Sequence, residues 1–138
     1  MNSIFKSFTA FLIGVVLVFS SCQKEDTDPS TDARDNYEGS WSCVENSSIT
    51  GTNPTFTVKI VKGSGDDEIV FQNFYALGNN NSATAVIDAN NFTINQQTVA
   101  GNTVKGSGNL QGPSAIFMTY SVFDGSTKDS VTATLSRQ

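Results

Sequence analysis

Apolar and polar residues alternate with period two through most of the chain after Tyr37, and this alternation predicts β-strands. In residues 55–61, for example, Phe56, Val58 and Ile60 share one face, and the polar residues Thr57 and Lys59 lie on the other. From Tyr37 onward, no segment repeats apolar residues at helical spacing over three turns. The third strand changes phase at Phe74, where we expect a bulge. The pattern as a whole predicts eight strands, at residues 40–46, 55–61, 68–77, 83–89, 92–99, 103–110, 114–123 and 130–137.

The connections between these strands are short. Residues 90–91 and 124–126 are typical of tight hairpins, and no helix or long crossover separates any two strands. The predicted fold is therefore all-β: an eight-stranded antiparallel meander that closes into a small barrel, because closure removes the sheet edges. An eight-stranded β-sandwich is the alternative. The expected interior consists of Trp41, Phe56, Val58, Ile60, Ile69, Phe71, Phe92, Ile94, Ile116, Met118, Tyr120, Val131 and Leu135.

Residues 1–21 have the features of a lipoprotein signal peptide. Lys6 supplies a positive charge, residues 8–19 are apolar, and the small residues Ser20 and Ser21 follow, as signal peptidases require. The apolar run is shorter than the roughly 20 residues that a membrane-spanning helix needs. A transmembrane anchor is the alternative interpretation of this segment.

The order Phe-Ser-Ser-Cys at residues 19–22 resembles a bacterial lipobox. The resemblance implies cleavage before Cys22 and acylation of its sulfur, and acyl chains contribute about 0.8 kcal/mol of membrane binding per buried CH₂ group. Residues 22–36 are polar, acidic and interrupted by Pro29, which predicts a flexible tether. The expected organisation is a signal peptide (1–21), a lipidated cysteine with its tether (22–36) and a barrel domain (37–138).

The four residues after the cysteine carry a second resemblance. Gln23, Lys24, Glu25 and Asp26 are similar to the short signal that sends some Bacteroidota lipoproteins to the outer face of the outer membrane. This resemblance implies a lipid-anchored protein exposed on the cell surface. The periplasmic face of the outer membrane is the alternative location.

Gly39, Trp41 and Arg137 resemble the closure of a calycin barrel, the fold of lipocalins and fatty-acid-binding proteins. In that family a Gly-x-Trp on the first strand lies against a basic residue of the last strand. The resemblance implies that Arg137 covers the Trp41 ring at the barrel floor, where a cation and an aromatic face attract by about 0.5–2 kcal/mol.

Small residues inside the barrel indicate a candidate ligand pocket. Ala85, Gly106 and Gly108 leave space on their faces, Tyr120 is expected inside, and Gln96 is in phase with Phe92 and Ile94 and would supply a polar group. Against a pocket, the large interior side chains are numerous enough to fill an eight-stranded barrel. Both interpretations stay open at this stage.

The composition of the chain excludes several kinds of catalytic and metal site. The chain has 138 residues, a net charge of −5 and no histidine, which excludes a Ser-His-Asp triad and a His-ligated zinc. Cys43 is in phase with Trp41 and is expected to be a small buried side chain. The acidic run Asp66–Glu68 is expected to be a solvated turn, since its spacing matches no calcium loop. We therefore expect no catalytic residues, no metal and no cofactor.

These observations favour a binding module over an enzyme. The first hypothesis is a lipid-anchored envelope or cell-surface module that holds a small apolar or amphipathic ligand, or uses its outer face on a protein or glycan. The alternative is a non-catalytic structural or accessory lipoprotein with a fully packed core that acts through contacts with envelope proteins. The absence of a basic stripe argues against nucleic acid as a partner.

Overall fold

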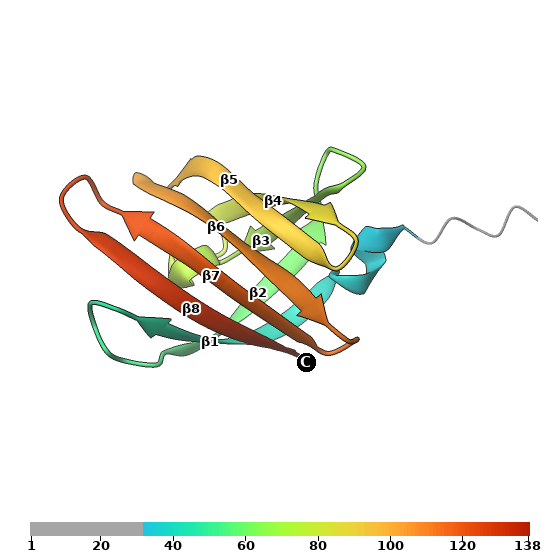
Figure 1. The fold of residues 1–138 in the computed structure, drawn as a ribbon, viewed down its shortest axis with the longest axis horizontal. Helices are drawn as coiled ribbons and strands as arrows, with labels where there is room; N and C mark the ends of the chain where they lie inside the picture. Colours follow the sequence, from blue (N-terminus) through green and yellow to red (C-terminus); the bar gives the residue numbers. More distant parts are fainter. Residues whose placement is uncertain (1–31) are drawn as a thin grey trace, which may run out of the picture.

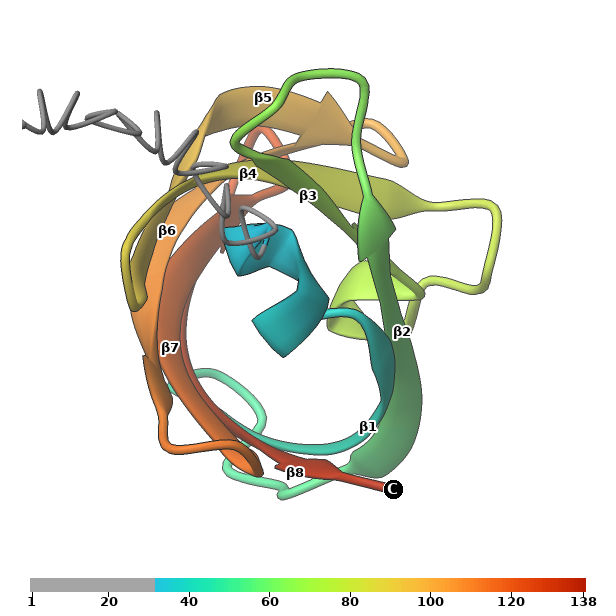
Figure 2. The same cartoon turned by 90° about the vertical axis from the view of Figure 1, so that its right-hand side faces the viewer.

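The computed structural model describes residues 32–138, which form one closed barrel of eight antiparallel strands. Figures 1 and 2 show the barrel from the side and along its axis. This confirms the predicted meander and excludes the sandwich. The elements are η1 (Ala33–Asn36), β1 (Gly39–Ser47), β2 (Thr55–Lys62), β3 (Glu68–Gln72), η2 (Phe74–Ala76), β4 (Ser82–Asp88), β5 (Asn91–Val99), β6 (Asn102–Gln111), β7 (Ala115–Phe123) and β8 (Lys128–Arg137).

Each strand pairs with the next one in sequence, and β1 pairs with β8 to close the barrel. This seam runs from the pair Trp41–Arg137 to the pair Ser47–Val131. The chain enters and leaves the barrel at the same end, where η1 lies within the ring of strands (Figure 2). We call this the closed end. The opposite end carries η2 and the β7–β8 turn, and we call it the η2 end. No helix within residues 32–138 combines the length and the apolar character that a membrane span requires.

Apolar side chains from every strand form one core cluster inside the barrel. Every residue of the expected interior set is buried except Phe56, which is half-buried and packs against the cluster. Tyr37 and Phe74 also belong to the core, although both lie outside the strands. Burial of apolar surface, at roughly 25 cal/mol per Å², is therefore the main force that holds the barrel together.

The third strand ends earlier than the sequence predicts. β3 stops at Gln72, and the residues in which we expected a bulged continuation form the short 3₁₀ turn η2. Asn73, Tyr75 and Ala76 have positive φ values of 61°, 54° and 55°, a conformation that non-glycine residues rarely adopt. The change of apolar phase at Phe74 is thus the start of a left-handed turn that directs Phe74 into the core.

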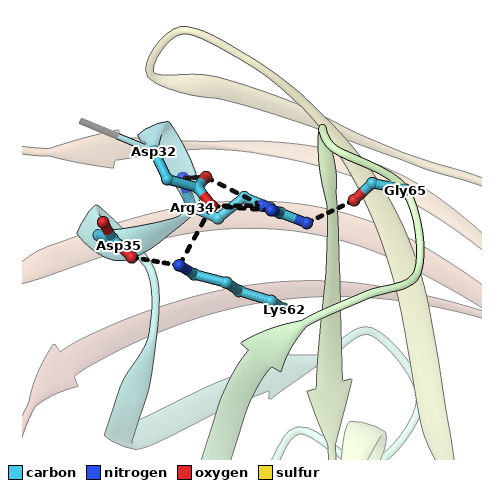
Figure 3. A network of polar contacts seen from close by, with 5 residues as sticks. All are labelled: Asp32, Arg34, Asp35, Lys62 and Gly65. Atoms are coloured by element: carbon cyan, nitrogen blue, oxygen red, sulfur yellow. Dashed lines mark hydrogen bonds and ion pairs between the residues drawn. The ribbon is translucent and has the colours of Figure 1, made fainter. Parts of the chain in front are cut away.

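Residues 32–36, which the sequence assigns to the tether, fold against the barrel as η1 and its N-cap. The Arg34 guanidinium donates to both carboxylate oxygens of Asp32 and to the carbonyl oxygen of Gly65 in the β2–β3 hairpin. The Lys62 ammonium lies 3.1 Å from Asp32 Oδ2 and also pairs with Asp35 (Figure 3). This clasp joins the residues before β1 to the β2–β3 hairpin, and Arg34 holds the pKa of Asp32 well below its usual range.

Two inward-facing glycines let β6 approach its neighbours closely. A Cβ atom on Gly106 would lie 2.4 Å from Tyr120 Cβ, and one on Gly108 would lie 2.4 Å from Phe92 Cζ. Both distances are far below van der Waals contact. The space that these glycines leave is therefore already filled by the Tyr120 and Phe92 side chains.

Gly106→Ala is expected to lower the free energy of unfolding by about 1–3 kcal/mol, because the added methyl group overpacks the wall against Tyr120 and the Thr119 carbonyl. Urea denaturation measures the change. Gly65→Ala is the matched control, since its Cβ would meet its nearest neighbours at 3.4 Å. Equal stability of the Gly106 variant and wild type would show that the barrel wall relaxes at no cost.

Candidate functional site

The closed end is built around Trp41, Arg137 and Gly39. The Trp41 ring is fully buried, and its Nε1 donates to the Tyr37 carbonyl oxygen at 2.8 Å. The Arg137 guanidinium carbon lies 4.3 Å from the centre of the Trp41 ring. Gly39 has φ +133°, and a Cβ there would lie 3.1 Å from Arg137 Nη1. The residues that the calycin resemblance singled out are therefore brought together here.

Arg137 also binds three backbone carbonyl groups, from two segments of the chain. Its Nε donates to the Pro113 carbonyl oxygen at 2.8 Å, and its Nη1 and Nη2 donate to the carbonyl oxygens of Glu38 and Asn36 at 2.8 and 2.5 Å. The side chain thus ties β8 to the β6–β7 connection, to the end of η1 and to the residue before β1. This arrangement seals the closed end and directs the donors of Arg137 at the backbone.

The η2 end contains a buried polar cluster instead. Glu45 and Asp129 are each 3% exposed, and Ser47 is 7% exposed. The Tyr120 hydroxyl donates to Glu45 Oε1. The Tyr75 hydroxyl donates to Asp129 Oδ2 at 2.8 Å, and the Ser47 hydroxyl donates to the same oxygen at 2.7 Å. We call these five residues the acidic cluster.

The two carboxyl groups of the acidic cluster have opposite electrostatic environments. Burial raises the pKa of Glu45 to about 7, and the nearby Asp129 charge adds to that rise, although the Tyr120 hydrogen bond opposes it. For Asp129 burial also acts to raise the pKa, but hydrogen bonds from Ser47, Tyr75 and Ser48 outweigh it and lower the pKa. Asp129 is therefore the ionised member, and Glu45 changes its protonation near neutral pH.

Two aromatic residues of η2 cover this cluster. Phe74 is buried, with its ring centre 4.6 Å from that of Tyr120, and the Tyr75 ring meets Tyr120 edge-on at 6.2 Å. The Asn73 side chain holds the turn, since its Nδ2 donates to the Thr57 carbonyl at 2.8 Å and its Oδ1 accepts from the Gly78 amide at 2.8 Å. Left-handed residues outside glycine cost on the order of 1–3 kcal/mol each, so η2 is a strained plug.

Of the predicted ligand pocket, Gln96, Gly106 and Tyr120 line one outer-face hollow of about 660 Å³, and Ala85 and Gly108 do not, so the five residues form no single interior cavity. Ala85 is buried in the core, and Gly106 and Gly108 face space that other side chains fill. Gln96 is exposed, which corrects its predicted inward orientation. The physical reason is a register shift in β5 between Ile94 and Gln97, after which Gln97 bonds the backbone of Thr84 in β4 through both of its amide atoms.

Of the predicted pocket residues, only Tyr120 belongs to the acidic cluster. The sequence analysis missed Glu45, Asp129 and Tyr75. A usable signal was present for the two acids, because Glu45 is in phase with Trp41 and Cys43, and Asp129 is in phase with Val131. Charged residues are rarely buried without partners, so a carboxylate on the inward phase of a strand marks a polar site. Cys43 itself is fully buried, and burial raises the pKa of its thiol.

A groove lies on the outer face of β5–β8. One hollow of about 660 Å³ has Thr93, Ser107, Thr119 and Thr132 in its lining, and an adjoining hollow of about 510 Å³ shares all four. These four residues are paired strand to strand across β5, β6, β7 and β8, and all are exposed. The face therefore carries a row of hydroxyl groups spaced at about 4.8 Å, the distance between neighbouring strands.

Cys22 and residues 23–26 lie outside the described residues, so their predicted roles as lipidation site and export signal stay predictions. The signal peptide predicted at residues 1–21 also lies outside the described residues and stays a prediction.

No protein-family model and no curated protein matches the chain. Three solved structures are similar to this chain, and each is matched over 78% of it. They are a redesigned β-barrel (16% identity, 96% of that chain, TM-score 0.56), EF1p2_mFAP2b bound to DFHBI (12%, 99%, 0.57) and a de novo designed fluorescence-activating β-barrel (17%, 98%, 0.53). At these identities the likeness concerns the fold.

Proposed function

We propose that this chain is an envelope lipoprotein whose barrel is a non-catalytic binding module for a small amphipathic ligand. The order Phe-Ser-Ser-Cys at residues 19–22 and the polar residues after it support the lipid anchor. The acidic cluster supports the ligand site and carries that part of the proposal. It is a buried polar site whose cover is a strained turn.

The contacts of η2 define the ligand chemistry. Tyr75 places an aromatic ring against Tyr120 and a hydroxyl donor 2.8 Å from Asp129 Oδ2. A small molecule with an aromatic body and a hydroxyl or ammonium donor would make the same contacts once η2 moves out. Relief of the left-handed strain in η2 would offset part of the cost of that movement. The similar structure EF1p2_mFAP2b is described as bound to the small molecule DFHBI, which is compatible with this use of the fold.

Tyramine is a suitable probe, because it joins a phenol ring to an ammonium group. At ten times its dissociation constant it is expected to raise the free energy of unfolding by about 1.4 kcal/mol, measured by thermal denaturation. Asp129→Asn should lose this stabilisation, since the buried anion is gone. 3-(4-Hydroxyphenyl)propionate has the same ring and a carboxylate, so repulsion from Asp129 should prevent its binding. A wild type that tyramine does not stabilise contradicts the proposed ligand site.

A packed-core accessory role is the second candidate function. The contiguous core and the filled space beside Gly106 and Gly108 favour it. In that case the domain would act through protein contacts at its surface and η2 would be a permanent part of the core. The tyramine titration separates the two functions, because a permanent plug leaves the unfolding curve unchanged.

Metabolic labelling with a fatty acid tests the anchor. The wild-type protein should carry the label, and Cys22→Ser should abolish it because the acceptor sulfur is lost. Surface exposure is tested in parallel by protease treatment of intact cells, which should degrade the wild type, whereas alanine at Lys24, Glu25 and Asp26 should protect it. Equal labelling of the serine variant would contradict the lipoprotein assignment.

A further inference from the structure

The outer face of β5–β8 differs in charge from the rest of the molecule. The chain has a net charge of −5. Yet the only carboxylate within the four strands β5–β8 is Asp129, which is buried inside the barrel. Lys105 and Lys128 are both exposed, and neither belongs to an ion pair among the described residues. An acidic protein thus has one sheet face on which every charge is positive.

Lys105 and Lys128 lie beside the same hollow. Both line a hollow of about 400 Å³, together with Gln96, Thr103, Ser121 and Phe123. In the strand register, Lys105 lies opposite Ser121 of β7, and Lys128 lies opposite Phe123 of the same strand. This hollow shares Gln96, Lys105 and Ser121 with the hollow of about 660 Å³, so the groove continues from the hydroxyl row to the lysines.

The outward side chains of β7 give the groove its apolar contacts. They are Phe117, Thr119, Ser121 and Phe123 in order, and the two phenylalanines are 49% and 41% exposed. Their exposed ring faces give the groove apolar surface against which a ligand can pack. Phe117 lines one end of the groove and Phe123 lines the other, with hydroxyl groups between them.

Two carboxylates that adjoin these four strands in the fold, Asp124 and Asp88, do not line the groove. Asp124 lies in the β7–β8 turn, where its Oδ1 accepts from the amides of Ser126 and Thr127 at 2.8 and 2.7 Å. Asp88 lies at the end of β4, beside Asn91 of β5. The lysine charges are therefore available to an external anion.

From these observations we propose that the β5–β8 groove binds an acidic polysaccharide. Hydroxyl and amide side chains hydrogen-bond the ring hydroxyls of a sugar, and Phe117 and Phe123 pack against the C–H faces of its rings. Lys105 and Lys128 pair with carboxylate groups along the polymer. The site is separate from the acidic cluster and does not depend on the ligand proposed for it.

Isothermal titration with polygalacturonate as the probe tests this site. Wild type should bind at low ionic strength and lose affinity as salt is added, since exposed charge pairs are screened. Lys105→Gln combined with Lys128→Gln should weaken binding about tenfold, a change of about 1.4 kcal/mol. Phe117→Ala should weaken it without loss of the fold, because that side chain is half exposed. Lys59→Gln is the matched control, an exposed lysine on the outer face of β2 that should leave binding unchanged.

Three results would overturn the proposal. The first is no binding of polygalacturonate by the wild-type protein. The second is equal affinity for neutral dextran, which would remove the role of the lysines. The third is equal affinity for a DNA duplex, or an equal loss in the Lys59 variant, since either would indicate general attraction to polyanions instead of recognition by the groove.

Discussion

Trp41→Ala is expected to lower the free energy of unfolding by about 3–5 kcal/mol, the usual cost of emptying an aromatic core site. The Trp41 ring is fully buried at the closed end, and its Nε1 fixes the carbonyl of Tyr37 at 2.8 Å. The substitution removes the ring from the core, the hydrogen bond to the segment before β1, and the surface on which Arg137 rests. Urea denaturation at neutral pH measures the effect.

The coupling between Trp41 and Arg137 is the sharper measurement. Arg137→Ala should cost about 2 kcal/mol through the loss of the cation–π contact and of hydrogen bonds to three carbonyl groups. In a double-mutant cycle the two effects should depart from additivity by at least about 0.5 kcal/mol, as for residues in contact. Arg137→Lys is the matched control, because it keeps the positive charge and loses the planar guanidinium group with its fixed set of donors. Additive costs would mean that the two residues stabilise the barrel independently.

Wild-type stability is expected to fall by up to about 3 kcal/mol as the pH rises from about 4.5 to about 7. Burial raises the pKa of Glu45 from its ordinary 4.5 to about 7. In this window the folded protein keeps the proton on Glu45 while the unfolded chain has lost it. Folding therefore binds a proton, and each increase in pH favours the unfolded state until Glu45 ionises in the folded state as well.

Denaturation curves across this pH range, with Glu45→Gln as the comparison, measure the effect. The glutamine variant keeps an acceptor for the Tyr120 hydroxyl, and its free energy of unfolding should not change with pH across this range. The window is free of histidine, since the chain has none. Asp129 acts at lower pH with the opposite sign, because its lowered pKa gives stability that is lost as the pH falls below about 4. A flat wild-type profile would show that Glu45 ionises as it does in the unfolded chain.

The strands could be predicted because their alternation is local and regular. Phe56, Val58 and Ile60 specify a half-buried strand by themselves, and the short turns leave few topologies other than a meander. The contact between Trp41 and Arg137 is visible from sequence only through a family resemblance. The two residues lie on the first and the last strand, far apart in the sequence, and no local pattern pairs them.

The acidic cluster could not be predicted as a unit because its members come from distant segments. Tyr75 reaches Asp129 only because Asn73, Tyr75 and Ala76 adopt left-handed backbone, and alternation alone reads those residues as strand. Gln96 shows the same limit. A shift of one residue in β5 moves it from the predicted interior to the surface, and the alternation of apolar residues before the shift does not reveal it.

The β1–β8 seam has a consequence for the order in which the barrel forms. The other strand pairs join neighbours in the chain and need only short loops to close, whereas the seam joins the first strand to the last. Since the entropic cost of closure grows with loop length, the seam is expected to form after the folding transition state. Substitutions at Trp41 and Arg137 should then act mainly on the unfolding rate and leave the folding rate nearly unchanged. The lifetime of the closed barrel, more than the speed of its assembly, depends on that seam.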